Sequence, residues 1–229
     1  MNIIILAAGK NIRIKKILKK IPKTMFLIHK KPILQHHIEN CVRYNFKKIF
    51  INTHYKKEII NNYFESGKNF KCSITYSYEK KLLGTSGAIF QLRNQIKSNF
   101  FCVIYGDNFF KINLAKMLEY HKSKKSDFTI ATVSKVPTKS GVLNFNKNKK
   151  IIKFEEKGKY IKQKKYNVNA GVYIINKKLL KFFKSGYSDF AYDLIPELIK
   201  SEKNLYSYNV RNKLVAIDTI NLFKKLSKN

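Results

Sequence analysis

Short apolar runs alternate with helix-like segments through the first half of this 229-residue chain, and this alternation restricts its fold more than any other feature. A strand–helix–strand repeat of this kind implies parallel strands that are joined by right-handed crossovers. The sequence therefore predicts an α/β fold with a Rossmann-like doubly wound sheet and helices on both faces. The expected strands lie at 2–7, 48–53, 72–78 and 100–105, and the expected helices at about 33–45, 56–64, 85–96 and 113–124.

The second half of the chain has a different pattern, in which short β-like runs follow one another closely. Strands that are joined without an intervening helix are typical of antiparallel pairs. We therefore expect one domain over residues 1–229, whose second half adds antiparallel strands to the same mixed sheet. The expected elements are strands at 128–134, 141–145, 151–154 and 168–175, a helix at about 190–200, and a last strand and helix between about 205 and 228.

The net charge of +33 suggests nucleic acid or an anionic membrane as a partner, but the type of basic residue argues against both. Only four of the 47 basic residues are arginine, whereas surfaces that read bases favour the bidentate guanidinium group. The lysines are also spread from Lys10 to Lys228, as codon bias in an AT-rich genome would place them. We therefore predict that the protein has no membrane partner and does not bind nucleic acid. A nucleic-acid-binding protein stays as an alternative that only the net charge supports.

Composition also indicates the compartment. No apolar run approaches the roughly 20 residues of a membrane span, and the run at 3–8 lacks the basic segment and the length of a signal peptide. The cysteines Cys41, Cys72 and Cys102 have no paired spacing, so neither a disulfide framework nor a zinc site is expected. The sequence therefore predicts a soluble, cytoplasmic protein whose thiols are core residues.

The first candidate site is the loop that follows the first strand. Gly9 permits a close approach of the backbone, and the amides of residues 8–13 can turn toward phosphate oxygens. Arg13 and Lys23 add positive charge. The segment is neither a P-loop nor a dinucleotide fingerprint, and an ordinary surface loop with solvated cations is the alternative.

The segment LLGTSGA at 82–88 stands at the start of an expected helix. Thr85 or Ser86 can cap that helix, and Gly87 leaves room for a flat ligand near its positive end. Plain helix capping is the alternative to ligand binding.

Two aspartates each end an apolar run that is typical of a buried strand. Asp107 follows the run at 101–105, and Asp218 follows the run at 214–217. A carboxylate is expensive to bury but is a good ligand for a hard cation. The pair suggests one or two Mg²⁺ ions, with a capping role as the alternative for either residue.

Two later segments place polar or small residues within short strands. FEEK at 154–157 carries two acids and a base, and Asn169 precedes Ala170 and Gly171 in an otherwise apolar run. A glycine within a strand often marks the close approach of a ligand or of another backbone. A turn and a bulge are the alternatives.

Taken in order, these segments resemble the sugar-1-phosphate nucleotidyltransferases, also called nucleoside-diphosphate-sugar pyrophosphorylases. The resemblance covers nearly the whole chain. It implies one nucleotidyltransferase domain with a nucleotide-binding half at 1–127 and a sugar-phosphate-binding half at 128–229. The motifs are LAAGKNIRI at 6–14 with PK at 22–23, PIL at 32–34, LLGTSGA at 82–88, YGDN at 105–108, SGV at 140–142, FEEK at 154–157, NAGVY at 169–173, and SDFAYDLIP at 188–196 with Asp218.

The resemblance implies a role for each matching residue. Arg13, Lys23 and Asp107 would be catalytic, with the two cations on the triphosphate, and Asp107 and Asp218 would hold Mg²⁺. The residues implied to contact the nucleoside are Leu6, Ala7, Ala8, Gly9, Gly84 and Gly87. Those implied to bind the sugar phosphate are Gly141, Glu156, Lys157 and Asn169.

Within the family, several motifs look most like those of the mannose-1-phosphate and heptose-1-phosphate guanylyltransferases. This likeness implies GTP and a sugar 1-phosphate of the mannose or heptose type, with an NDP-sugar for cell-surface polysaccharide as the product. Cytidylyl- and thymidylyltransferases share many of the motifs and remain alternatives. An assembly of identical chains is compatible with the sequence.

The chain departs from the family pattern at a few positions. Asn11 and Ile12 replace a glycine and a threonine, Gly158 replaces a proline, and Ile220 replaces a glycine. Asparagine tolerates positive φ, so Asn11 can preserve the turn, but Ile12 lacks a hydroxyl that could meet phosphate. These departures leave open a non-catalytic relative that binds a nucleotide sugar.

Overall fold

The computed structural model describes residues 1–9, 21–109, 111–135, 141–156, 166–210 and 215–216, and its frame is a mixed sheet. The first half of the chain supplies parallel strands in the order β5-β4-β1-β6, in which β1 pairs with both β4 and β6. The predicted parallel, doubly wound arrangement is thus confirmed. The strands are β1 (Asn2–Leu6), β4 (Lys48–Thr53), β5 (Ser73–Tyr78) and β6 (Phe100–Tyr105).

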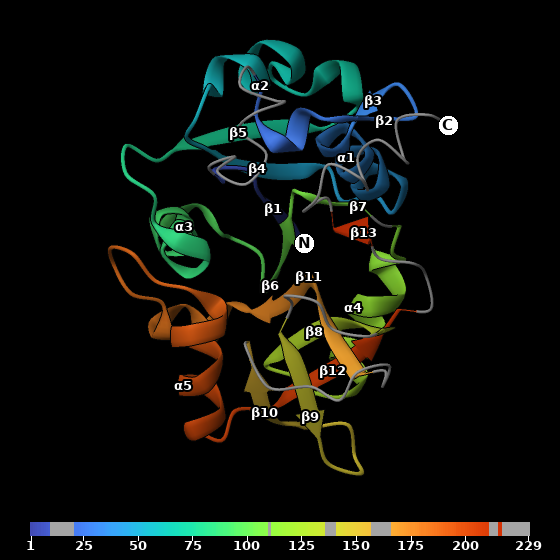
Figure 1. Cartoon of the computed structure of the whole chain (residues 1–229), viewed down its shortest axis with the longest axis vertical. Coiled ribbons are helices and arrows are strands. Elements are labelled where there is room, and N and C mark those ends of the chain that lie inside the picture. Colours follow the sequence, from blue (N-terminus) through green and yellow to red (C-terminus); the bar gives the residue numbers. More distant parts are fainter. Residues whose placement is uncertain (10–20, 110, 136–140, 157–165, 211–214, 217–229) are drawn as a thin grey trace.

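The second half extends the same sheet with antiparallel strands, as expected. The long strand β11 (Tyr166–Asn176) pairs antiparallel with β6 and carries the sheet from one half of the chain to the other (Figure 1). Its other edge pairs antiparallel with β8, and Val168 near its start pairs with Val142 of β9. β10 pairs with β9, and β12 runs parallel to β8. These strands are β8 (Phe128–Lys135), β9 (Val142–Phe145), β10 (Ile151–Glu155) and β12 (Leu205–Asn209).

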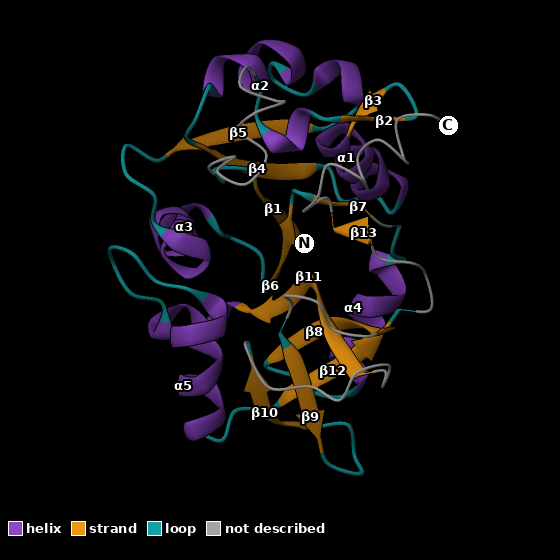
Figure 2. Cartoon of the chain, in the orientation of Figure 1, coloured by secondary structure: helices purple, strands orange, loops and turns teal. Residues whose placement is uncertain are grey.

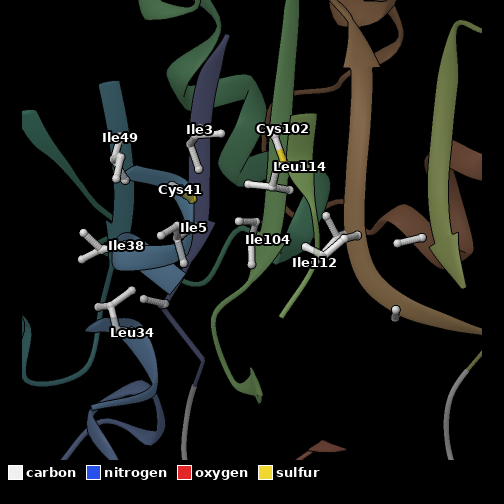
Figure 3. Packing of buried hydrophobic residues seen from close by; sticks show 14 of the residues in the cluster. Ile3, Ile5, Leu34, Ile38, Cys41, Ile49, Cys102, Ile104, Ile112 and Leu114 are labelled. Atoms are coloured by element: carbon white, nitrogen blue, oxygen red, sulfur yellow. The ribbon is translucent and has the colours of Figure 1, made fainter. Parts of the chain in front are cut away.

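Helices cover both faces of the sheet because the side chains of each central strand point alternately to either face (Figure 2). Ile3 and Ile5 of β1 pack in one core with α1, α2 and α4, whereas Ile4 packs in a second core with α3 and α5. Figure 3 shows the first of these cores. The helices are α1 (Ile33–Arg43), α2 (Lys57–Phe64), α3 (Gly84–Leu92), α4 (Leu114–Ser123) and α5 (Ile195–Lys200).

Burial explains why β1 reads as a continuous apolar run. Ile3, Ile4 and Ile5 are completely buried, because both faces of this central strand are covered. Full burial of one such side chain stabilises the fold by about 1.5–3 kcal/mol. The first strand is therefore a rigid base for the loop that follows it.

Some elements differ from the sequence-based expectation. The helix expected over 190–200 begins as a π-helical turn at Phe190–Leu194 and becomes regular only in α5, and the helix expected over 85–96 ends at Leu92 with a 3-10 turn at Arg93–Gln95. The part of the last expected helix beyond residue 216 lies outside the described residues. Elements that the sequence did not predict are the hairpin β2 (Leu27–Ile28) and β3 (Lys31–Pro32), the short strand β7 (Asn108–Phe109), and 3-10 turns at Lys23–Met25, Lys68–Phe70 and Lys177–Phe182. β7 pairs with β13 (Val215–Ala216), which lies within the apolar run expected at 214–217.

The described helices are all too short or too polar to cross a membrane. All three cysteines are free, and Cys41 and Cys102 are buried. Burial raises the pKa of both thiols well above the usual range, so these thiols stay protonated and unreactive. Their predicted role as core residues is confirmed for these two, while Cys72 is only partly buried.

Candidate functional site

The candidate site lies where β1 and β6 end, at the point where the strand order reverses. On one side of β1 lie β4 and then β5, and on its other side lies β6. The chain therefore leaves the neighbouring strands β1 and β6 in opposite directions along the sheet. Such switch points are where open α/β sheets bind ligands. The two loops are joined at their origin, because the Gly106 amide donates a 3.0 Å hydrogen bond to the Leu6 carbonyl.

The loop after β1 is buried at its start and open at its end. Ala7 and Ala8 are buried, whereas Gly9 is exposed, and no described heavy atom lies within 4 Å of the position that a Cβ of Gly9 would occupy. The approach of a ligand to this exposed backbone stays a prediction. The departures at Asn11 and Ile12, together with Arg13, lie outside the described residues.

An ion pair joins two of the predicted catalytic residues across this site. Lys23 Nζ lies 2.7 Å from Asp107 Oδ2, and the two side chains are 17% and 40% exposed. An ion pair that is this accessible to water stabilises a fold by about 1 kcal/mol or less. The pair therefore adds little to the stability of the fold. Its main effect is to place a positive and a negative group side by side at the switch point, where solvent reaches both.

A buried polar network that sequence reasoning missed supports the same loop. Asn52 Oδ1 accepts a 2.6 Å hydrogen bond from the Ala7 amide, and Asn52 Nδ2 donates a 2.6 Å hydrogen bond to Glu79 Oε1. Glu79 Oε2 accepts a 3.0 Å hydrogen bond from the Leu83 amide. Asn52 and Glu79 are 3% and 2% exposed. One polar residue at the end of β4 and one just after β5 thus connect the loop after β1 to the segment before α3.

The signal for this network was present in the sequence. Asn52 follows the apolar residues Ile49–Ile51 near the end of a strand, which is close to the pattern that singled out Asp107, whereas Glu79 follows the largely polar strand SITYSY at 73–78. Because both side chains are almost fully buried and hydrogen-bonded, they hold the loops in place and do not face solvent.

The start of α3 packs against a distant loop. The amides of Ser86 and Gly87 donate to the Ser188 carbonyl at 2.9 and 3.2 Å. A Cβ on Gly84 would collide with the Ser188 backbone, and one on Gly87 would collide with the Gly186 carbonyl. This close approach accounts for both glycines, and their implied contact with a nucleoside stays a prediction.

The expectation that Thr85 or Ser86 caps this helix is wrong. Leu83 is the N-cap residue, and no side chain caps the helix. Thr85 Oγ1 instead donates a 3.0 Å hydrogen bond to Asp189 Oδ2 and accepts one of 2.7 Å from the Phe190 amide. At the start of this helix the Ser188 carbonyl accepts from the backbone amides of Ser86 and Gly87. The hydroxyl of Thr85 is therefore available for the contact with Asp189.

The predicted sugar-side residues that the structure describes lie together. The backbone amide of Asn169 donates a 2.8 Å hydrogen bond to the Gly141 carbonyl, and a Cβ on Gly141 would lie 2.5 Å from Glu156 Oε2. Gly141, Glu156 and Asn169 therefore form one cluster near β9, β10 and β11. Lys157 lies outside the described residues.

The described residues contain no cluster of three or more histidine, cysteine, aspartate or glutamate side chains that could hold a metal ion. Asp107 provides a partly exposed carboxylate, a donor type that Mg²⁺ prefers. Asp218 lies outside the described residues. In β13, which precedes it in the sequence, Ala216 pairs with Asn108, the residue directly after Asp107. The described part of the site is therefore compatible with a magnesium ion at Asp107.

His37 of α1 supports the turn that carries Asp107. Its Nε2 lies 2.6 Å from the Asn108 carbonyl oxygen. Burial lowers the pKa of His37 from 6.5 to about 4. The ring is therefore neutral at pH 7, with its Nε2–H donating to this carbonyl.

This burial makes stability depend on pH. Burial also lowers the pKa of His121 to about 4, whereas an unfolded histidine titrates near 6.5. The unfolded chain thus binds more protons between these pH values, and the free energy of unfolding is expected to fall as pH decreases through this window. The loss approaches about 3 kcal/mol per histidine near the lower limit.

Urea unfolding at a series of pH values between about 7 and 4 measures this loss. The His37→Gln and His121→Gln variants should each remove about half of the pH dependence in this window. An unchanged pH dependence in the double variant would contradict the assignment. Desolvation acts to raise the pKa of Glu39, but the hydrogen bonds from Lys31 and Gln35 outweigh it and lower this pKa. Protonation of Glu39 therefore reduces the free energy of unfolding only below about pH 4.5.

Comparisons with known proteins agree with this geometry. A family model described as nucleotidyl transferase matches residues 2–214. The UTP–glucose-1-phosphate uridylyltransferase of Synechocystis sp. is 29% identical over 96% of this chain, which spans 61% of that relative's length. The D-glycero-alpha-D-manno-heptose 1-phosphate guanylyltransferase of Aneurinibacillus thermoaerophilus is 32% identical over 79% of this chain and 77% of its own length.

A solved structure has the same fold. The crystal structure of HddC from Yersinia pseudotuberculosis, complexed with GMP-PN, superposes with a TM-score of 0.82 over 99% of this chain and 98% of that one. The two sequences are 23% identical, so the likeness concerns the fold.

Proposed function

Because this chain belongs to the nucleotidyl transferase family, we propose that it transfers a nucleotidyl group from a nucleoside triphosphate to a sugar 1-phosphate. The observation that carries the proposal is the Lys23–Asp107 pair at the switch point, directly beside the loop that ends at Gly9. An ammonium group and a carboxylate, both partly accessible, suit a ligand that carries phosphate groups and a divalent cation.

The reaction is an in-line displacement at the α-phosphorus. An oxygen of the sugar phosphate forms a new bond to the α-phosphorus. The bond between the α-phosphorus and the oxygen that bridges the α- and β-phosphates breaks, and pyrophosphate leaves with the electron pair of that bond. A phosphate monoester is already anionic at neutral pH, so no general base is required. Positioning and neutralisation of charge supply the rate enhancement.

The chain's own residues supply this neutralisation. Lys23 and Arg13 balance the charge of the triphosphate and of the departing pyrophosphate. Asp107 and Asp218 hold Mg²⁺, which when bound withdraws charge from phosphate oxygens. The ion pair with Asp107 keeps the Lys23 ammonium group at the site before the nucleotide binds.

The two halves of the sheet divide the substrates between them. Residues 1–127 bind the nucleotide, through the loop Leu6–Gly9 and the start of α3. Residues 128–229 bind the sugar phosphate, with Glu156 and Asn169 on sugar hydroxyls, Gly141 under the ring, and Lys157 on the phosphate. The proximity of Gly141, Glu156 and Asn169 supports this division.

We favour GTP as the nucleotide and a mannose- or heptose-type sugar 1-phosphate as its acceptor. The LLGTSGA loop and the identity to the heptose 1-phosphate guanylyltransferase support this choice. The identity to a uridylyltransferase and the motifs shared with cytidylyl and thymidylyl enzymes support other bases. In each case the product is an NDP-sugar, made in the cytoplasm for cell-surface polysaccharide.

A screen for pyrophosphate release tests the proposal. The protein is incubated with Mg²⁺, each of the common nucleoside triphosphates, and a panel of sugar 1-phosphates. We expect pyrophosphate only when both substrates are present, with the highest rate for GTP and a mannose- or heptose-type acceptor. Binding of an NDP-sugar without pyrophosphate from any pair would instead identify a non-catalytic relative.

A further inference from the structure

We propose that the Tyr173 hydroxyl is a positioning group that fixes the Asn169 amide in the orientation in which it binds a sugar hydroxyl. The inference rests on the proposed role of Asn169 on the sugar side. It adds a residue that does not touch the substrate but determines the geometry of one that does.

The Asn169 side chain is held at both ends. Its Nδ2 donates a 2.7 Å hydrogen bond to the Tyr173 hydroxyl, and its Oδ1 accepts a 2.9 Å hydrogen bond from the Gly171 amide. Gly171 has φ +76°, a conformation that favours glycine. Because the Gly171 amide can only donate, the carbonyl end of the Asn169 side chain must face it.

This orientation leaves Asn169 with a defined binding capacity. One Nδ2–H and one lone pair of Oδ1 remain after the two contacts are counted. Asn169 is half-buried, and its backbone amide is bonded to the Gly141 carbonyl beside Glu156, among the residues that are proposed to bind the sugar. A hydroxyl group can both donate and accept, and it therefore matches the donor and acceptor that Asn169 still offers.

Tyr173 itself is completely buried among aromatic rings. Its ring lies 4.9 Å from that of Phe190, 5.6 Å from that of Phe128 and 5.3 Å from that of Tyr105, measured between centroids. A buried hydroxyl is costly unless it is hydrogen-bonded, and phenylalanine would fill the same apolar space. The hydroxyl is retained and accepts its hydrogen bond from the Asn169 side chain.

Tyr105 extends the contact toward the nucleotide half. Its ring packs against that of Tyr173, and its surroundings include Thr85 in the first turn of α3. Burial raises the pKa of Tyr105 and of Tyr173 well above the usual range for tyrosine. Both hydroxyls therefore remain neutral hydrogen-bonding groups near pH 7, which suits a role in positioning.

The test compares Tyr173→Phe with the wild-type protein, using the most active pair of substrates from the pyrophosphate screen. Without this acceptor the Asn169 side chain is held only at its carbonyl end, by the Gly171 amide, and its Nδ2 can swing away. The KM for the sugar 1-phosphate should therefore rise about five- to tenfold, as expected for one lost hydrogen bond. The KM for the nucleoside triphosphate should change less than about twofold. Tyr120→Phe is the matched control, because it removes a tyrosine hydroxyl that donates to the Ser207 carbonyl at 3.0 Å in another part of the fold.

Asn169→Ala separates this inference from the proposed function. If Asn169→Ala raises the KM for the sugar 1-phosphate and Tyr173→Phe does not, the positioning role is refuted and the sugar-side assignment stands. If neither variant alters that KM, or if no pair of substrates reacts, the sugar-side assignment fails and the inference falls with it. In the double variant, Tyr173→Phe should add no further effect, and additive effects would also overturn the proposal.

A loss of packing would have a different signature. Thermal unfolding shows whether Tyr173→Phe and Tyr120→Phe are destabilised alike. Only Tyr173→Phe should raise the KM for the sugar 1-phosphate while leaving the KM for the nucleoside triphosphate nearly unchanged. If Tyr173→Phe does not fold, Tyr173→Met decides the question, because it also removes the hydroxyl that accepts from Asn169 and leaves an apolar side chain in the same buried space. A selective rise in the KM for the sugar 1-phosphate supports the proposal, and an unchanged KM refutes it.

Discussion

Replacement of Asp107 with alanine is expected to lower the rate of nucleotidyl transfer by about 10²-fold or more, the usual cost of losing a strong electrostatic stabiliser. The change removes the carboxylate that is proposed to hold Mg²⁺ and leaves the Lys23 ammonium group without its 2.7 Å partner. The same effect is expected for Asp218→Ala. Steady-state pyrophosphate release, measured over a range of Mg²⁺ concentrations, quantifies the loss.

Two further variants identify the cause of that loss. Glu39→Gln is the matched control, because it removes the carboxylate of another lysine ion pair, 2.8 Å from Lys31 Nζ on the surface of α1, and should leave the rate unchanged. Lys23→Met should lower the rate without altering the Mg²⁺ requirement, whereas Asp107→Ala should raise the concentration that is needed. Full activity of Asp107→Ala would remove this residue from the catalytic site, and an unaltered Mg²⁺ requirement would remove the metal assignment.

Asn52→Ala is expected to have the largest effect on stability. It leaves the Ala7 amide without its 2.6 Å acceptor and removes a donor from the buried Glu79 carboxylate. Unsatisfied buried groups of this kind cost about 1–3 kcal/mol each, so the free energy of unfolding should fall by about 3 kcal/mol. Affinity for the nucleoside triphosphate should fall as well, because the loop that ends at Gly9 loses its anchor.

Urea unfolding measures the change in stability, and calorimetric titration with GTP measures the affinity. Asn144→Ala provides the control, since Asn144 donates to Glu155 Oε2 at 3.4 Å in an exposed position, and its loss should cost less than about 0.5 kcal/mol. Equal effects of the two substitutions would show that the buried network does not support the loop.

The sequence marks part of the candidate site through signals that are local. A carboxylate after an apolar strand identified Asp107, and a small residue before a basic segment identified Gly9. The motif order identified the family, which the comparisons confirm. The same local signal was present at Asn52 and was overlooked, because its meaning depends on a partner in the next strand.

Predictions failed where a tertiary contact competed with a local one. Thr85 has the chemistry of a helix cap, but its hydroxyl bonds to Asp189, which is 104 residues away in the sequence. Gly87 suggested room for a flat ligand, and the Gly186 carbonyl lies where its Cβ would be. The implied contact of Gly87 with a nucleoside stays a prediction. In both cases the competing partner comes from a loop whose position depends on the packing of the whole second core.

The sequence by itself determined the parallel frame, the antiparallel extension and the family, because apolar periodicity and turn residues act over short stretches of chain. Only the tertiary structure decided which polar groups meet. Lys23 and Asp107 are 84 residues apart in the sequence, and Ala7 and Asn52 are 45 residues apart. Strand order and register bring each pair into contact, and a hydrogen bond or ion pair forms only at that short range.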